Sequence, residues 1–191
     1  MDKEYQKMII ITAPSGAGKT SITRHLLKSF PILAFSVSAA TRRPRADEKN
    51  GVDYYFIPIE EFKQKILEHE FVEWEIVYEG KYYGTLKSEL KRIWKSGKIP
   101  VMDIDVKGAI HVQREYPVNS LFIFIEPPSI EELKKRLQTR GSETLESLNA
   151  RINKSSFELS FKNNFENIIV NTDLQKACAE AEAIVSSFIN K

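Results

Sequence analysis

The sequence has little cysteine, no long hydrophobic run and no large excess of charge of either sign. Cys178 is the only cysteine among 191 residues, which excludes an intrachain disulfide and is typical of proteins from a reducing compartment. No apolar run approaches the length of a membrane-spanning helix, and the polar segment 1–7 lacks the apolar centre of a signal peptide. From these absences we expect a cytoplasmic protein with no membrane partner.

The charge balance argues against a nucleic-acid partner. Lys and Arg number 28 and Asp and Glu 26, giving a net charge of +2, and the basic residues form no single long block. With 42% hydrophobic and 28% charged residues, the composition is that of an ordinary globular protein with a true core. The chain has no internal repeat, and its length suits one domain, residues 1–191, with small inserted regions.

One stretch near the N-terminus predicts a phosphate-binding loop. Residues 8–11 are apolar without alternation, which indicates a strand buried on both faces, and residues 21–30 carry apolar side chains at helical spacing. The turn between them consists of Ala13, Pro14, Ser15, Gly16, Ala17, Gly18, Lys19 and Thr20. Strand, glycine turn and helix in this order are the context that such a loop requires.

The residue types of this turn suit nucleotide phosphates. Gly16 and Gly18 let backbone N–H groups converge on phosphate oxygens. Lys19 would meet the β- and γ-phosphates of ATP, and the Thr20 hydroxyl would help to hold Mg²⁺. Ala13 stands where the general pattern has glycine, so we expect an ordinary backbone conformation there. The alternative is a simple glycine turn with a surface lysine, but the intact strand–turn–helix context favours phosphate binding.

Carboxylates follow or interrupt two other predicted strands. Residues 99–105 indicate a second buried strand that ends in Asp103 and Asp105, at the sheet edge where ligands bind in open α/β folds. An acid there can help to hold Mg²⁺ or can only cap the next helix. Residues 71–78 alternate, so Glu73 and Glu75 share one face; ligand recognition is one interpretation, and solvent exposure is the commoner one.

Arginines gather in two further segments. Residues 38–45 place arginines beside hydroxyl groups, which suits bidentate phosphate binding, although a solvated basic loop would show the same pattern. Ser129 and Glu132 have the spacing of a capping box at a helix start. This helix and the next, which carries Arg151, form an arginine-rich hairpin between core strands. We interpret the hairpin as a lid, and a solvated hairpin is the alternative.

Together these segments resemble the guanylate kinase family over nearly the whole chain. The matching segments are 13–20, 36–45, 50–56, 71–74, 82–85, 103–105, 127–129, 133–141 and 169–171. The resemblance implies an α/β fold with a P-loop NTPase-type parallel sheet core flanked by helices, an inserted GMP-binding region and a helical lid. The implied bounds are 1–35, 90–129 and 163–191 for the core, 36–89 for the GMP-binding region and 130–162 for the lid.

The resemblance also implies the reaction ATP + GMP ⇌ ADP + GDP with Mg²⁺, with dGMP as a further candidate acceptor. The implied GMP phosphate contacts are Arg42, Arg45, Tyr54 and Tyr83. The implied contacts to the rest of GMP are Ser38, Glu73 and Thr85 at guanine, with Asp103 at either the ribose or the metal. The implied ATP contacts are the loop 13–20, Arg136, Arg140 and Asn171. The implied catalytic residues are Lys19, Arg45, Arg140 and Arg151, and the implied metal contacts are Thr20 and Asp103.

Two other functions compete with this interpretation. Non-catalytic guanylate-kinase-like modules bind phosphopeptides, but they usually have a degraded phosphate loop, whereas this chain keeps Lys19 and Thr20. A P-loop kinase for another monophosphate or a phosphorylated sugar is the second alternative, and Glu73 and Ser38 argue against it. ATP consumption that depends on GMP excludes the first alternative, and a panel of acceptors tests the second.

Overall fold

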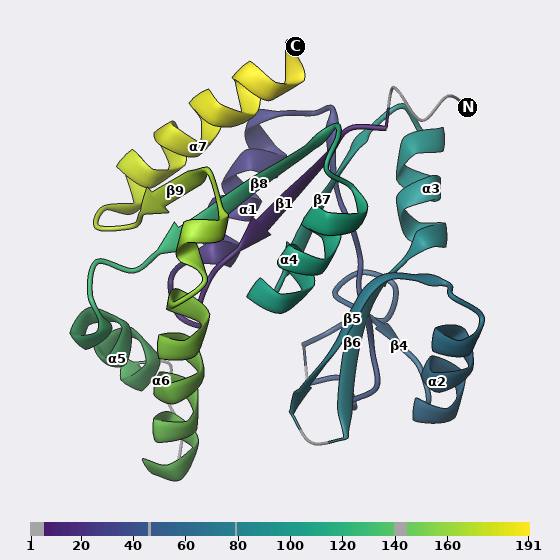
Figure 1. The fold of residues 1–191 in the computed structure, drawn as a ribbon, viewed down its shortest axis with the longest axis horizontal. Coiled ribbons are helices and arrows are strands. Elements are labelled where there is room, and N and C mark those ends of the chain that lie inside the picture. Colours follow the sequence, from purple (N-terminus) through teal and green to yellow (C-terminus); the bar gives the residue numbers. More distant parts are fainter. Residues whose placement is uncertain (1–5, 46, 79, 140–144) are drawn as a thin grey trace.

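A parallel five-stranded sheet forms the centre of the computed structural model, which describes residues 6–45, 47–78, 80–139 and 145–191 (Figure 1). The strand order is β2-β7-β1-β8-β9, and every pair is parallel. The strands are β1 (Met8–Thr12), β2 (Leu33–Phe35), β7 (Ile99–Ile104), β8 (Ser120–Glu126) and β9 (Asn167–Val170). The apolar runs at 8–11 and 99–105 are thus neighbouring core strands, which confirms the predicted fold class.

Alternate residues of the strands face two separate cores. The flanking helices are α1 (Lys19–Ser29), α3 (Lys87–Lys95), α4 (Val106–Glu115) and α7 (Leu174–Ile189). On β1, Ile9 and Ile11 pack with α1 and α7, whereas Met8 and Ile10 pack with α3 and α4. Burial on both faces explains why this strand shows no polar alternation. Among the described helices, none combines the length and the apolar character that crossing a bilayer requires.

A second sheet of four strands lies beside the core in the order β4-β3-β6-β5. Its elements are β3 (Ala39–Ala40), β4 (Tyr55–Phe56), β5 (Phe71–Tyr78), β6 (Lys81–Leu86) and the covering helix α2 (Ile59–Leu67). Phe62 of α2 is fully buried, and its ring stacks on Phe71 with centroids 4.3 Å apart. All these elements fall within the segment 36–89, which the family resemblance implies to be one inserted region.

A buried carboxylate fastens the second sheet to the core. Glu89, in the first turn of α3, is 3% exposed. It accepts hydrogen bonds from the Val37 backbone N–H (3.1 Å) and the Tyr55 hydroxyl (3.1 Å), and Arg92 donates two more at 2.8 Å. Val37 lies in the connection between β2 of the core and β3 of the second sheet. Glu89 therefore holds the junction of the two sheets in place.

The predicted helical hairpin consists of α5 (Ile130–Thr139) and α6 (Leu145–Leu159), followed by a short 3-10 helix, Lys162–Asn164. The Glu132 backbone N–H donates to Ser129 Oγ at 3.1 Å, as the capping pattern predicts. Leu133 and Leu137 are buried and pack with Ile152 of α6. Figure 1 shows the hairpin and the second sheet extending from the same end of the core, on opposite sides. Arg140 lies outside the described residues.

Candidate active site

The loop between β1 and α1 depends on two glycines. Gly16 and Gly18 have φ angles of 89° and 102°, in the left-handed region that glycine adopts without strain. Among the described residues other than glycine, only His69 and Asn119 have positive φ, so Ala13 has the ordinary conformation that we predicted. The loop then enters α1 with no side-chain cap on its first N–H groups. Unpaired N–H groups and a helix dipole at such a position suit the binding of an anion.

Asn171 supports this loop from the side. Its side-chain Nδ2 donates to the Ala17 carbonyl at 2.7 Å, and the residue is only 4% exposed. A Cβ atom at Gly18 would collide with that amide group, so the glycine is needed for space as well as for its backbone angle. The Asn171 carbonyl accepts a hydrogen bond from Arg136 Nη2 at 3.1 Å. The nucleotide contacts of Asn171 and Arg136 stay predictions.

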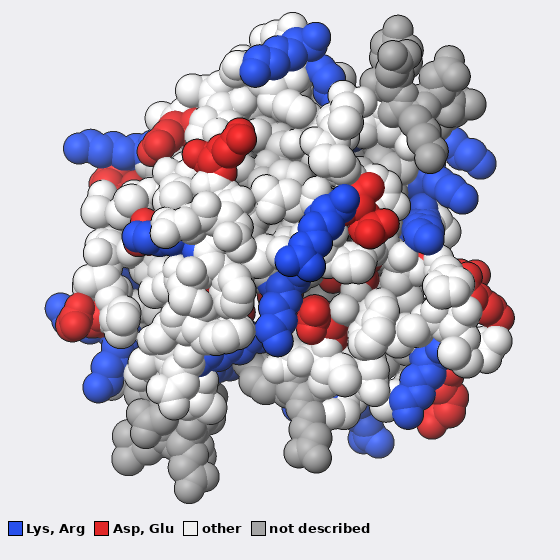
Figure 2. All heavy atoms as spheres, in the orientation of Figure 1, with Lys and Arg blue, Asp and Glu red and all other residues white. Residues whose placement is uncertain are grey.

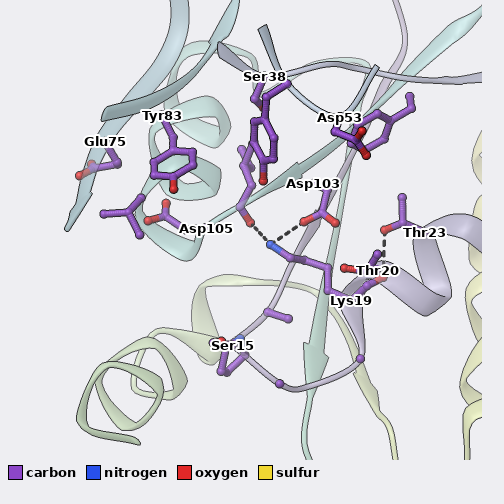
Figure 3. Close-up of a pocket in the computed structure, with 18 of the residues that line it drawn as sticks. Ser15, Lys19, Thr20, Thr23, Ser38, Asp53, Glu75, Tyr83, Asp103 and Asp105 are labelled. Carbon is purple, nitrogen blue, oxygen red and sulfur yellow. Dashed lines mark hydrogen bonds and ion pairs between the residues drawn. The ribbon is translucent and has the colours of Figure 1, made fainter. Parts of the chain in front are cut away.

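Lys19 pairs with the carboxylate at the end of the neighbouring strand. Its Nζ lies 2.6 Å from Asp103 Oδ1 and donates to the Ile104 carbonyl at 2.8 Å (Figure 3). The register of β1 and β7 places Ile11 opposite Asp103, which brings the acid to the start of the loop. Burial alone would lower the pKa of Lys19, but the charge and hydrogen bond of Asp103 raise it above its ordinary value. The lysine is therefore a fixed positive charge in the site.

One pocket of about 940 Å³ joins the loop, the second sheet and α6. The predicted site residues that line it are Ala13, Pro14, Ser15, Gly16, Gly18, Lys19, Thr20, Ser38, Arg45, Tyr54, Glu73, Tyr83, Asp103 and Arg151. The predicted residues Ala17, Arg42, Thr85, Arg136 and Asn171 lie outside this lining. Figure 3 shows Thr20 on one side of the pocket and Tyr83 on the other. On the face shown in Figure 2, acidic and basic side chains lie close together around the central hollow.

Glu73 lines the pocket and is buried. The alternating pattern of its strand more commonly indicates solvent exposure, and that interpretation is wrong for this residue. It is 5% exposed, whereas Trp74 and Ile76 on the opposite face of β5 are 40% and 50% exposed. The Thr85 hydroxyl donates to Glu73 Oε1 at 2.7 Å. Burial raises the pKa of Glu73 to about 7; the bond from Thr85 opposes this rise, and the charge of Asp105 adds to it.

The two carboxylates at the end of β7 have different roles. Asp105 caps α4, because its Oδ1 accepts from the Gly108 backbone N–H at 2.8 Å, while Asp103 pairs with Lys19. Gly108 also leaves room for Glu73, since a Cβ atom there would lie 2.7 Å from Glu73 Oε2. The capping interpretation thus holds for Asp105, whereas the predicted part of Asp103 in holding Mg²⁺ stays a prediction.

The sequence reasoning missed two charged residues of α6. Lys154 and Glu158 line the pocket together with Arg151. Glu158 is 6% exposed and burial raises its pKa, while its Oε2 atom has no hydrogen-bond partner. Because these residues follow one another at spacings of three and four, they share one face of the helix. That spacing is the signal by which Lys154 and Glu158 could have been found.

A glycine loop with a charged lysine, at the carboxyl edge of a parallel sheet and open to a deep pocket, defines a P-loop nucleotide-binding protein. Within that class, the family model of guanylate kinase matches residues 5–188. The chain belongs to the guanylate kinase family.

Individual relatives agree with this assignment. A guanylate kinase of Bacteroides thetaiotaomicron is 44% identical over 185 residues, which cover 97% of this chain and 91% of the relative. A guanylate kinase of Porphyromonas gingivalis is 45% identical over 186 residues, covering 97% and 99% of the two chains. The crystal structure of guanylate kinase from Anaplasma phagocytophilum superimposes with a TM-score of 0.77 at 29% identity, covering 97% of this chain and 87% of the other.

Proposed function

We propose that this protein transfers the γ-phosphoryl group of ATP to GMP and releases ADP and GDP. The observation that carries the proposal is the buried carboxylate of Glu73 in the same pocket as the phosphate loop and Lys19. One cavity therefore offers an anion-binding end for a phosphoryl donor and a hydrogen-bond acceptor suited to guanine. The guanylate kinase activity for which the relatives are named supports the same reaction. The single cysteine suits the cytoplasm, where we place the reaction.

The donor end would hold ATP with Mg²⁺. Thr20 and Asp103 line the pocket together with the loop, and hydroxyl and carboxylate oxygens suit Mg²⁺. Among the described residues, no three acidic, histidine or cysteine side chains converge on a metal site, which fits an ion held mainly by phosphates and water. Bound Mg²⁺ would neutralise phosphate charge and orient the γ-phosphoryl group. Lys19 would then contact the β- and γ-phosphates.

The acceptor end would recognise guanine by its hydrogen-bond donors. Guanine presents N1–H and a 2-amino group, and the Glu73 carboxylate can accept from both. Ser38 lines the same pocket and would donate to O6. Thr85 holds one Glu73 oxygen at 2.7 Å and so fixes the direction of the carboxylate. Adenine offers an N1 lone pair where Glu73 needs a hydrogen, so we expect AMP to be rejected.

Transfer itself needs positioning and charge stabilisation. The attacking oxygen of GMP is already ionised, so no protein base is required. Lys19, Arg45 and Arg151 line the pocket and would neutralise the charge that develops on the migrating phosphoryl group. The hairpin that carries Arg151 would close over the site and keep water from accepting the phosphoryl group. Arg140 is a further predicted partner.

Changing Glu73 to glutamine tests the proposal through base specificity. The amide of Glu73→Gln directs an N–H group at a guanine donor, so we expect kcat/KM for GMP to fall about 10²-fold or more. The discrimination against AMP, expected to reach roughly 10⁴ in the unmodified protein, should narrow. Steady-state ADP release with each nucleotide measures both quantities. Glu75→Gln is the control, because it makes the same chemical change two residues along the strand. A larger effect of Glu75→Gln than of Glu73→Gln would show that Glu73 is not the carboxylate that recognises guanine.

The raised pKa of Glu73 predicts a pH dependence of GMP use. Below a pKa of about 7 the carboxyl group is protonated and cannot accept from both guanine donors. We therefore expect kcat/KM for GMP to fall up to about tenfold per pH unit below that pKa and to level off above it. The GMP phosphate itself titrates near pH 6, a step that Glu73→Gln retains. Identical profiles for the two proteins would show that Glu73 does not titrate in this range.

A further inference from the structure

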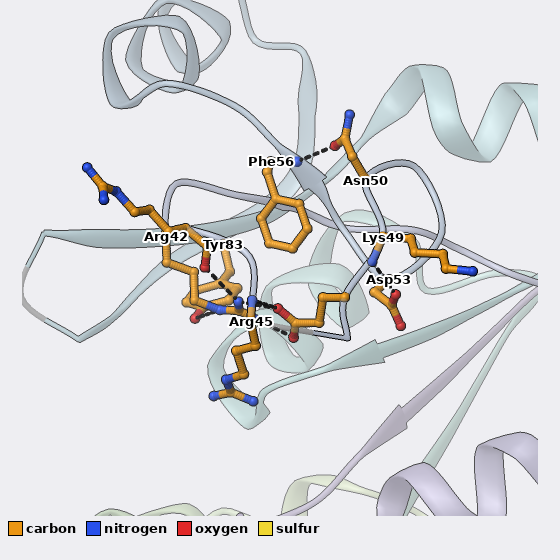
Figure 4. A network of polar contacts seen from close by, with 9 residues as sticks. Arg42, Arg45, Lys49, Asn50, Asp53, Phe56 and Tyr83 are labelled. Carbon is orange, nitrogen blue, oxygen red and sulfur yellow. Dashed lines mark hydrogen bonds and ion pairs between the residues drawn. The ribbon is translucent and has the colours of Figure 1, made fainter.

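The guanidinium group of Arg42 is engaged by other protein groups rather than facing the pocket. Nη1 and Nη2 donate to the two carboxylate oxygens of Glu48 at 2.5 and 2.6 Å (Figure 4). Nη1 also donates to the Arg43 carbonyl at 3.1 Å, and Nε donates to the Tyr83 hydroxyl at 3.0 Å. The ring of Tyr54 lies against the group, with its centroid 4.9 Å from the guanidinium carbon. Arg42 therefore has four of its five N–H groups paired within the protein.

The bond from Arg42 fixes what the Tyr83 hydroxyl can do. A phenol has one hydrogen to donate, and its oxygen can accept at the same time. Because the Tyr83 oxygen already accepts from Arg42 Nε, its own hydrogen is directed elsewhere. Tyr83 lines the pocket, so this hydrogen is available to an anion bound there. Arg42 thus reaches the pocket indirectly, through a hydroxyl group that it polarises.

Glu48 also fixes the neighbouring arginine. Its Oε2 accepts from the Arg45 backbone N–H at 2.8 Å, which closes the short turn between the two residues. Figure 4 shows the Arg45 side chain leaving this network, and Arg45 is one of the residues that line the pocket. Hydrogen bonds from Arg42 lower the pKa of Glu48 to about 2, so the carboxylate is charged at any pH at which the protein works.

We propose that Glu48 is a positioning residue for the phosphate group of GMP. It holds Arg42 so that Tyr83 donates its hydroxyl hydrogen to the phosphate, and it holds the turn from which Arg45 enters the pocket. This inference rests on the proposed function, because it concerns the same acceptor nucleotide. The opposite role is that of a competitor, in which the Glu48 carboxylate occupies Arg42 until phosphate displaces it. The two roles predict changes in GMP affinity of opposite sign.

The steady-state kinetics of Glu48→Gln distinguish the positioning role of Glu48 from the competitor role. The variant keeps the shape of the side chain but removes its charge and one acceptor of the bidentate pair. We expect KM for GMP to rise about tenfold, while KM for ATP and kcat at saturating GMP stay within about threefold. A lower KM for GMP would show a competitor, and an unchanged one would show that Glu48 has no part in binding. Calorimetric titration with GMP measures the same change without turnover.

Matched variants separate this effect from a general loss of structure. Glu70→Gln removes an ion pair of 2.9 Å with Lys65 in the same inserted region, and it should leave both KM values unchanged. Glu48→Asp keeps the charge with a shorter reach and should give a KM for GMP between those of the unmodified protein and Glu48→Gln. If Glu48→Gln does not fold, Glu48→Asp supplies the test, and its KM for GMP should exceed that of the unmodified protein. Thermal unfolding of each variant reports on its fold.

A double-mutant cycle tests the route through Tyr83. If Glu48 acts by way of Arg42 and the Tyr83 hydroxyl, adding Glu48→Gln to Tyr83→Phe should raise KM for GMP less than about threefold further. If the fold-changes in KM of the two single variants instead multiply in the double variant, Glu48 does not act through Tyr83. Absence of GMP-dependent turnover in the unmodified protein would refute the proposed function itself. Normal turnover with an unaffected Glu48→Gln variant would refute only the role of Glu48.

Discussion

Lys19→Met is expected to lower kcat about 10³-fold or more while changing GMP affinity less than about threefold. Methionine keeps the length and the apolar stem of the side chain but removes the charge. In the structure this charge lies in the loop, 2.6 Å from Asp103, at the donor end of the pocket. ATP phosphates would be its partners, whereas GMP would bind on the second sheet. Coupled ADP release measures kcat, and calorimetric titration measures GMP affinity.

The control for this variant lies on the same helix. Lys28→Met removes an exposed lysine from the last turn of α1 and should leave kcat unchanged. Thermal unfolding of Lys19→Met shows whether loss of the pair with Asp103 disturbs the apo protein. Turnover that survives within a factor of about ten, roughly 1.4 kcal/mol, would contradict the role given to Lys19.

Arg151→Ala is expected to reduce kcat by roughly 10³ if this residue acts like an arginine finger. Arg151 lines the pocket and belongs to α6, which Figure 1 shows across from the second sheet. The free energy of unfolding of the apo protein should change little. Lys134→Ala, an exposed lysine on α5 outside the pocket, is the matched loss of one positive charge. A variant that loses its fold but keeps its rate when folded would show that Arg151 is structural.

The core could be predicted from the sequence because its strands are unbroken apolar runs between turn residues. For the helix α4, only a possible cap was proposed from the sequence, without the bounds of the helix, and the reason is local. A single residue, Asp105, separates β7 from α4, so no turn or loop signal divides the two elements. Gly108 in the first turn of α4 lowers helix propensity further. Gly108 stands at a position where a larger side chain would collide with Glu73.

The sequence predicts which residues belong to the site better than it predicts how they are arranged. Alternation along β5 shows that Glu73 and Trp74 face opposite ways, but only the packing of α4 and the second sheet decides which face is buried. The charge of Arg42 is visible in the sequence, whereas its pairing with Glu48 comes from the folding of an irregular turn. Periodicity carries no information about such a contact.

The most direct test of the central claim is ADP release by the unmodified protein with ATP, Mg²⁺ and one acceptor at a time: GMP, dGMP, AMP, CMP or UMP. We predict that ATP is consumed in equal amount to the GDP formed, and that AMP, CMP and UMP support kcat/KM values at least about 10³-fold lower than GMP. ATP consumption that does not depend on GMP, or that AMP supports equally well, would contradict the account.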